Sequence, residues 1–224
     1  SASGAMLSMG AGTPDEAEAK QALRERGLPV PDGRRVRDVE EAVEAATTLG
    51  FPVALKALGI AHKSEHGAVR LNLRDAMAVR GAATALLPLG TGLYVERMIE
   101  GGVAELIVGI TRDPLFGPVM TVGSGGVLVE LLKDSATLLL PATAGEVEAA
   151  LRGLKLFPLL DGYRGRPKAD IGAAVRAIQG IAGFASANAA RLDELDINPL
   201  IVCAEGNGAF IADALMVLGG HGHD

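Results

Sequence analysis

The stretch ELDINPLIVCAEGNGAFIADALMVL, which runs from Glu194 to Leu218, predicts two strands joined by a tight turn. Side chains alternate between the two faces of a strand, so Glu194, Asp196 and Asn198 share one face. The apolar residues between them point to the other face. Because AEGN supplies the residue types that favour a turn, we expect an antiparallel hairpin here.

The register of this hairpin places Asn198 opposite Asp213, because both lie equally far from a turn centred on Glu205–Gly206. The Cβ atoms of directly opposed residues lie roughly 4.5–5.5 Å apart. Amide and carboxylate oxygens are hard ligands that suit Mg²⁺, with water and phosphate completing the shell. The alternative is a solvated edge hairpin whose polar residues face water, and Pro199 could shift the register. The spacing alone leaves both interpretations open.

A second informative stretch is PVALKALGIAHKSEHGAVRLNL, Pro52 to Leu73. It begins as an apolar strand that contains Lys56, and His62 and His66 follow in the next loop. Lys56 either reaches the surface along its apolar stem or holds phosphate oxygens with a point charge on a rigid strand. His62 is either a surface residue or a reactive one. The glycines match neither a P-loop nor a dinucleotide-binding fingerprint.

The rest of the sequence alternates helix signals with pairs of strands. TPDEAEAKQALRERG predicts a helix with Thr13 as its cap, Pro14 at the first helical position, Glu16 completing a capping box and Gly27 ending it. Adjacent strand pairs separated by helices predict an α+β fold with antiparallel sheets. Further helices are expected over residues 38–50, 75–87, 146–152 and 170–190, and strands over 67–73, 93–98, 104–113 and 119–123.

Composition narrows the class of protein. The 224 residues are 49% hydrophobic, and the net charge of −6 argues against nucleic-acid binding. No apolar run approaches the ~20 residues that span a bilayer, so no membrane segment is expected. The single cysteine, Cys203, fits a reducing compartment, and we expect a cytoplasmic protein. Residues 1–12, which open with SASGAM, are expected to be a tag remnant and a disordered lead.

Four segments, read in order, resemble one known family. VALKALGIAHKSEHGAVRLNL, VERMIEGGVAELIVGITRDPLFGPVMTVGSGGVLVELLKD, LLDGYRGRPKAD and ELDINPLIV…IAD resemble the ATP-grasp domain of NDP-forming acyl-CoA synthetases. This is the family of ADP-forming acetyl-CoA synthetase, related to succinyl-CoA synthetase β subunits. The resemblance implies an ATP-grasp fold of two antiparallel-rich lobes with flanking helices and nucleotide between them. It implies one domain over residues 13–224, with a smaller lobe at about 28–94 and a larger one at about 95–218.

The resemblance also implies roles for residues of the nucleotide site. Lys56 matches the lysine that contacts the α- and β-phosphates. Val95 to Met98 match the hinge whose backbone meets the adenine, with Val95, Glu96 and Met98 in the nucleotide pocket. Glu105 matches a second glutamate of that site. ATP or ADP is therefore the implied cofactor.

Three further residues match the chemistry of phosphoryl transfer in this family. Asn198 and Asp213 match the Mg²⁺ ligands of the related β subunits, in agreement with the hairpin register. His62 matches a second phosphohistidine that carries phosphate between nucleotide and a companion domain. Mg²⁺ is thus the implied metal.

The resemblance implies one part of an acid–CoA ligase that interconverts acyl-CoA, ADP and phosphate with free acid, CoA and ATP. The CoA-binding and ligase domains would be a companion, on the same polypeptide or a separate chain. Without them, the chain is expected to bind nucleotide but not to make acyl-CoA. The alternative is a nucleotide-sensing regulatory domain of a synthetase-like protein acetyltransferase, and a third hypothesis is an interaction subunit with a decayed nucleotide site.

Overall fold

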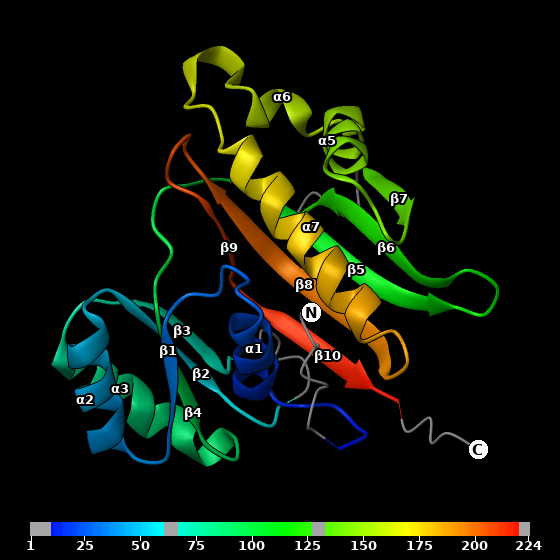
Figure 1. Ribbon diagram of the computed structural model, residues 1–224. Helices are drawn as coiled ribbons and strands as arrows, with labels where there is room; N and C mark the ends of the chain where they lie inside the picture. The colour runs from blue at the N-terminus through cyan, green and yellow to red at the C-terminus, as the bar shows by residue number, and fades with distance from the viewer. Residues whose placement is uncertain (1–9, 61–66, 127–132, 220–224) are drawn as a thin grey trace. The chain divides into compact units, whose positions relative to one another are not determined.

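The computed structural model describes residues 10–60, 67–126 and 133–219, which form two compact units (Figure 1). Helix α1, Glu16–Glu25, is divided between them, since its first turn belongs to the small unit and the remainder to the large unit. The small unit comprises Asp15–Glu18 and Pro31–Ile99. The large unit comprises the described residues of Ser1–Pro14, Ala19–Val30 and Glu100–Asp224.

The small unit is a four-stranded antiparallel sheet in the order β1-β4-β2-β3, with α2 and α3 packed on one face. Alternation along β2 directs Val53, Leu55 and Ala57 into the core under these helices. The elements are β1 (Gly33–Val36), α2 (Val39–Leu49), β2 (Val53–Ala57), β3 (Val69–Leu73), α3 (Ala76–Leu86), the 3₁₀ turn η1 (Leu87–Leu89) and β4 (Leu93–Arg97).

Local signals define both helices of the small unit. The carboxylate of Asp38 accepts a hydrogen bond from the backbone N–H of Glu41, and Asp75 accepts one from Ala78, so each aspartate caps its helix. Gly50 ends α2 with a positive φ of 83°. These limits confirm the predicted helices over residues 38–50 and 75–87 to within one residue.

The large unit is a six-stranded antiparallel sheet in which β10, β8, β5, β6 and β7 follow one another and β9 also pairs with β8. The α+β class with antiparallel sheets is therefore confirmed. The elements are β5 (Gly102–Asp113), β6 (Gly117–Ser124), β7 (Ser135–Leu139), α5 (Ala144–Gly153), α6 (Phe157–Leu160), the 3₁₀ turn η3 (Tyr163–Gly165), α7 (Ile171–Ala187), β8 (Leu192–Cys203), β9 (Ala209–Ile211) and β10 (Ala214–Leu218).

The two faces of the large sheet differ in chemistry. One face contributes Leu106, Val108, Leu195 and Ile197 to a core that α1, α5, α6 and α7 complete. Figure 1 shows α7, the longest helix, lying along the strands of this sheet. Alternation places polar residues of β5 and β8 on the opposite face, where the candidate site of this unit lies.

Residues far apart in sequence meet at one edge of the large unit. Gly12 and Leu218 form an isolated antiparallel bridge. The Gly12 N–H donates to the Leu218 carbonyl at 2.9 Å, and the Leu218 N–H donates to the Gly12 carbonyl at 2.8 Å. The chain segment before α1 is thereby fixed beside β10.

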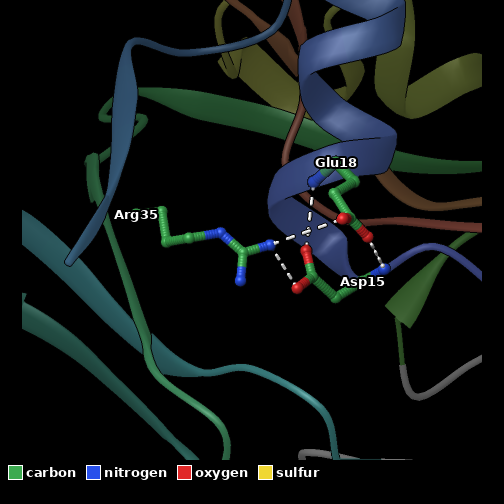
Figure 2. A network of polar contacts seen from close by, with 3 residues as sticks. All are labelled: Asp15, Glu18 and Arg35. Atoms are coloured by element: carbon green, nitrogen blue, oxygen red, sulfur yellow. Dashed lines mark hydrogen bonds and ion pairs between the residues drawn. The ribbon is translucent and has the colours of Figure 1, made fainter. Parts of the chain in front are cut away.

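The predicted cap of α1 is wrong, although its end is correct. Asp15 rather than Thr13 caps the helix, because the Glu18 N–H donates to Asp15 Oδ1 at 3.1 Å and the Asp15 N–H donates to Glu18 Oε2 at 2.9 Å (Figure 2). This reciprocal pair is a capping box two residues later than expected. Arg35 of β1 also pairs with Asp15 and so favours this position. Gly27 ends the helix with a φ of 74°.

Three further features differ from the sequence prediction. Strands β1 and β7 were not predicted, because each has only four or five residues and gives a weak sequence signal. The second arm of the hairpin is divided into β9 and β10, since regular pairing is interrupted at Ala212 and Asp213. The segment VLVELL, residues 127–132, lies outside the described residues. No helix in the described part of the chain is long and apolar enough to cross a membrane.

Candidate functional site

Lys56 is the centre of a buried charge cluster in the small unit. Its neighbours on β2 point toward the helices, so the Lys56 side chain points to the other face of the sheet. Its Nζ lies 2.7 Å from Glu16 Oε1 and 2.7 Å from Glu96 Oε1. The exposed fractions of the three side chains are 7% for Lys56, 1% for Glu16 and 5% for Glu96. The structure thus brings together two predicted residues, Lys56 and Glu96, and adds Glu16.

Desolvation is the main cost of this cluster. Burial disfavours a charged ammonium, and two carboxylates in contact with it offset that cost. Removing one partner of a buried ion pair typically destabilises a fold by about 3–5 kcal/mol, because the remaining charge is left uncompensated. The two carboxylate contacts therefore fix the position of the Lys56 side chain on this face of the sheet.

The structure places Val95 in the core of the small unit and Met98 beside Pro52. The Val95 side chain is fully buried in the core under α2 and α3. Met98 follows β4 directly, and its N–H donates to the carbonyl of Pro52 at 3.0 Å. An adenine that accepted a hydrogen bond from Met98 would have to replace this bond.

The large unit confirms the predicted register of the C-terminal hairpin. Leu200 pairs with Ile211 on one side of the interruption and Ile197 with Ala214 on the other, which is the register that sets Asn198 against Asp213. The Asn198 N–H donates to the Asp213 carbonyl at 3.3 Å. A register shift does occur beside Pro199, but in the pairing of β8 with β5 and not in the hairpin. There, Asn198 and Pro199 together oppose one residue of β5.

The bulge in β8 and the interrupted strand beside it determine the surroundings of Asn198 and Asp213. Bulges re-aim side chains and are common next to active sites. Asn198 is exposed and Asp213 is half-buried, with Asp213 Oδ1 accepting a hydrogen bond from the Ala214 N–H at 2.8 Å. One amide oxygen and one carboxylate suit Mg²⁺, which keeps waters and binds phosphate oxygens besides a few protein ligands. The described residues hold no cluster of three or more His, Cys, Asp or Glu side chains that would form a closed metal site. The donor set therefore fits a Mg²⁺ that arrives with phosphate.

Asp196 lies two residues from Asn198, on the same face of β8. Partial burial raises the pKa of its carboxyl group, and the neighbouring charge of Glu194 raises it further. Asp196 thus holds a proton more readily than an exposed aspartate does. The sequence showed that these side chains share a face, but the strength of burial depends on the neighbouring strands.

Glu105 is exposed on β5 and lies against the glycines of the GSGG segment. The Gly125 N–H donates to the Glu105 carbonyl at 2.8 Å. A Cβ at Gly125 would lie 2.9 Å from the Glu105 carbonyl carbon, and one at Gly126 would lie 3.3 Å from Glu105 Oε2. Gly126 also has a φ of 77°. Gly125 is therefore required by the close approach of two backbones, and Gly126 by its positive φ.

Lys20 of α1 is a buried charged residue that sequence reasoning missed. Its side chain is fully buried, and Nζ donates to the carbonyl of Ala212 at 2.7 Å. Ala212 directly precedes Asp213 in the interrupted arm, so Lys20 helps to hold this arm in place. A lysine inside an amphipathic helix gives no signal for such a contact. His62, the predicted phosphohistidine, lies outside the described residues.

Comparison with known proteins gives one family. A family model of the ATP-grasp domain matches residues 5–218. The chain is 33% identical over 216 residues to the acetate–CoA ligase (ADP-forming) II subunit beta of Pyrococcus furiosus, covering 92% of this chain and 91% of that protein. It is 34% identical over 209 residues to the 4-hydroxybutyrate–CoA ligase (ADP-forming) of Nitrosopumilus maritimus, covering 88% of this chain but 30% of that protein. Similar sequences thus occur as a whole subunit and as less than a third of a longer chain.

A solved structure of a relative is similar over the same span. The dinucleotide-forming acetyl-coenzyme A synthetase 1 of Ca. Korarchaeum cryptofilum superposes with a TM-score of 0.82 at 34% identity, covering 92% of this chain and 93% of that chain. That structure is in complex with coenzyme A and Mg-AMPPCP, and its phosphohistidine segment points towards the nucleotide binding site.

Proposed function

Because this chain belongs to the ATP-grasp domain family, we propose that it is the nucleotide-binding part of an ADP-forming acid–CoA ligase. The predicted ATP-grasp fold is confirmed by the family match and by the solved relative. The observation that carries the proposal is the register of the C-terminal hairpin, which sets the two Mg²⁺-type donors Asn198 and Asp213 against each other.

In this proposal, each unit supplies its own set of groups to Mg²⁺ and ATP or ADP. The large unit supplies Asn198 and Asp213 to the metal and Glu105 to the nucleotide. The small unit supplies the ammonium of Lys56 to the phosphates, together with Glu96. The backbone of Val95 and Met98 meets the base, and the Met98 N–H exchanges its present bond when it does so.

The chemistry of these groups is positioning and charge neutralisation. Phosphoryl transfer needs the attacking and leaving oxygens in line and the negative charge of the phosphates compensated, which a lysine and a divalent cation provide. The overall reaction converts acyl-CoA, ADP and phosphate to free acid, CoA and ATP, and it is reversible. His62 carries the phosphoryl group as a phosphohistidine between the nucleotide and the companion domain.

We also propose a companion and a location for the protein. The CoA-binding and ligase groups belong to a companion domain, which the two kinds of relative support, since the similar segment occurs both alone and within a longer chain. A cytoplasmic location is supported by the single, buried Cys203 thiol, because reduced thiols persist in that compartment.

Isothermal titration calorimetry with ATP and ADP tests this function. Wild-type protein is expected to bind both nucleotides more tightly with Mg²⁺ than with EDTA, and Asp213→Asn is expected to remove most of that difference. Glu205→Gln, in the turn of the same hairpin, serves as the matched control and should bind like wild type. The purified chain should make no acyl-CoA without a companion. Absence of nucleotide binding by folded wild-type protein would contradict the proposal.

A further inference from the structure

We propose that Glu16 determines the specificity of the Lys56 site, by favouring nucleotides whose phosphates already carry a divalent cation over metal-free nucleotides. This inference rests on the proposed function, because it assumes that Lys56 contacts nucleotide phosphate. It concerns a residue that the sequence interpretation placed in a capping box and that the structure places in an ion pair instead.

The first turn of α1 is built to hold Glu16 in position. The reciprocal hydrogen bonds between Asp15 and Glu18 close this turn, and Arg35 reaches it from β1 and pairs with both carboxylates (Figure 2). Glu16 lies between the two capping residues in sequence, and its side chain is only 1% exposed. Its carboxylate is therefore directed at Lys56 by the surrounding structure and not by chance contact of a mobile side chain.

The charge of Glu16 changes what Lys56 attracts. The ammonium is in contact with two carboxylates, so these three groups together carry one excess negative charge. In a buried environment, charges act on one another more strongly than in water. A metal-free nucleotide brings several negative charges and is repelled by the carboxylates as well as attracted by Lys56. Mg²⁺ cancels part of the phosphate charge, so the repulsion falls while the contact with Lys56 remains.

The sign of the effect does not depend on the other neighbours of Lys56. Removing one negative charge beside the ammonium raises the electrostatic potential there, whatever else surrounds it. The gain is larger for a ligand with more negative charge. Glu16→Gln, which keeps the size and one acceptor oxygen of the side chain, should therefore help metal-free nucleotide more than Mg²⁺–nucleotide.

The experiment compares dissociation constants for ADP and ATP with Mg²⁺ and with excess EDTA, by calorimetry on the full chain. In Glu16→Gln, the affinity for metal-free nucleotide is expected to rise on the order of tenfold, and the affinity for Mg²⁺–nucleotide is expected to rise less. Glu16→Asp keeps the charge and should largely restore the wild-type ratio. Glu40→Gln, which breaks an exposed pair with Arg80 in the same unit, is the matched control and should keep that ratio.

The possible failures are distinguishable. If wild-type protein binds no nucleotide, the proposed function itself fails. If wild type binds but Glu16→Gln leaves the ratio unchanged, or weakens both affinities in parallel, Glu16 is only structural and the inference is wrong. If Glu16→Gln does not fold, a measurement on the wild-type protein alone still tests the inference. Without metal, the affinity of wild type should not increase from ADP to the more highly charged ATP. An increase would overturn the inference.

Discussion

Lys56 has a structural role in addition to its proposed contact with phosphate, because its ammonium separates two buried carboxylates. Lys56→Met would leave the buried carboxylates of Glu16 and Glu96 without the ammonium that contacts both of them. We expect a loss of about 3–5 kcal/mol in the free energy of unfolding, measured by urea denaturation. The double variant Lys56→Met/Glu16→Gln should recover part of this loss. If Lys56→Met alone were as stable as wild type, the cluster would not be the buried ion pair described above.

This coupling affects how nucleotide-binding data are interpreted. Lys56→Ala is expected to lose affinity for nucleotide, but a partly unfolded variant would lose it too. Unfolding curves therefore have to accompany the titrations.

Asp134 illustrates a different electrostatic effect in the large unit. Burial raises the pKa of its carboxyl, but the hydrogen bonds that it accepts from the Ser124 hydroxyl and from the N–H groups of Lys155 and Leu156 outweigh this and hold the pKa below its usual value. A depressed folded-state pKa gives stability that is present above the unfolded pKa and lost as pH falls through the folded one.

Asp134→Asn should therefore be less stable than wild type near neutral pH, by roughly 1–3 kcal/mol, because the amide cannot accept all of these bonds. The difference should shrink as the pH falls below about 4, because Asp134 then takes up its proton in the unfolded chain before it does so in the folded protein, whose pKa is lower. Denaturant unfolding at several pH values measures it. Asp161→Asn, at an exposed pair with Lys168, is the control, and a difference that did not vary with pH would contradict the prediction.

His62 remains a prediction from the sequence resemblance. A phosphorylatable imidazole must be neutral when it attacks the phosphorus, so that a ring nitrogen is free to form the bond. His62→Ala should leave the affinity for Mg²⁺–nucleotide nearly unchanged and abolish phosphoryl transfer in enzyme reconstituted with its companion. Normal turnover of that variant would show that the histidine does not carry phosphate.

At the scale of elements, sequence signals succeeded where the interaction that forms an element is local. Asp38, Asp75 and Asp170 each cap the helix that they were expected to begin, because a cap involves residues three positions apart. The register of the C-terminal hairpin was predictable for the same reason, since a tight turn determines which residues face each other. The cap of α1 was not, because Arg35, twenty residues away, favours Asp15 over Thr13.

The residues of the candidate site also fall into those that the sequence alone could place and those that it could not. Asn198 and Asp213 could be paired from the sequence because one turn joins their strands. Glu16 and Lys20 could not be assigned, because each contacts a residue distant in sequence, and only the packing of α1 shows which side chains it buries. Burial also decides the pKa of Asp196, and the sequence pattern does not measure burial.

The GSGG segment gives a prediction at this scale. A Cβ at Gly125 would collide with the backbone of Glu105, so Gly125→Ala should lower the free energy of unfolding by about 1–3 kcal/mol. Gly109→Ala, on β5 of the same sheet, meets nothing within 4 Å and is the matched control. Thermal or urea denaturation compares the two. Equal stability of both variants would mean that the approach of Gly125 to Glu105 is not needed for the fold.

At the scale of the whole molecule, nucleotide binding should appear as added stability. A ligand that binds only the folded state stabilises it by about 2.7 kcal/mol at a hundred times its dissociation constant. Mg²⁺–ATP should therefore raise the melting temperature measured by calorimetry or dye fluorescence, and Asp213→Asn should respond much less. A melting temperature that did not change with saturating Mg²⁺–ATP would contradict nucleotide binding by this chain.

The bridge between Gly12 and Leu218 has a consequence for how such a segment is used in evolution. Because two hydrogen bonds hold these positions side by side, the first and last described segments of the large unit meet at one edge of its sheet. A segment of this kind can be inserted into a longer gene or separated from it without altering its interior. A circular permutant that joins Gly12 to Leu218 through a short linker, with new termini in the Asp113–Gly117 turn, should accordingly fold and bind nucleotide.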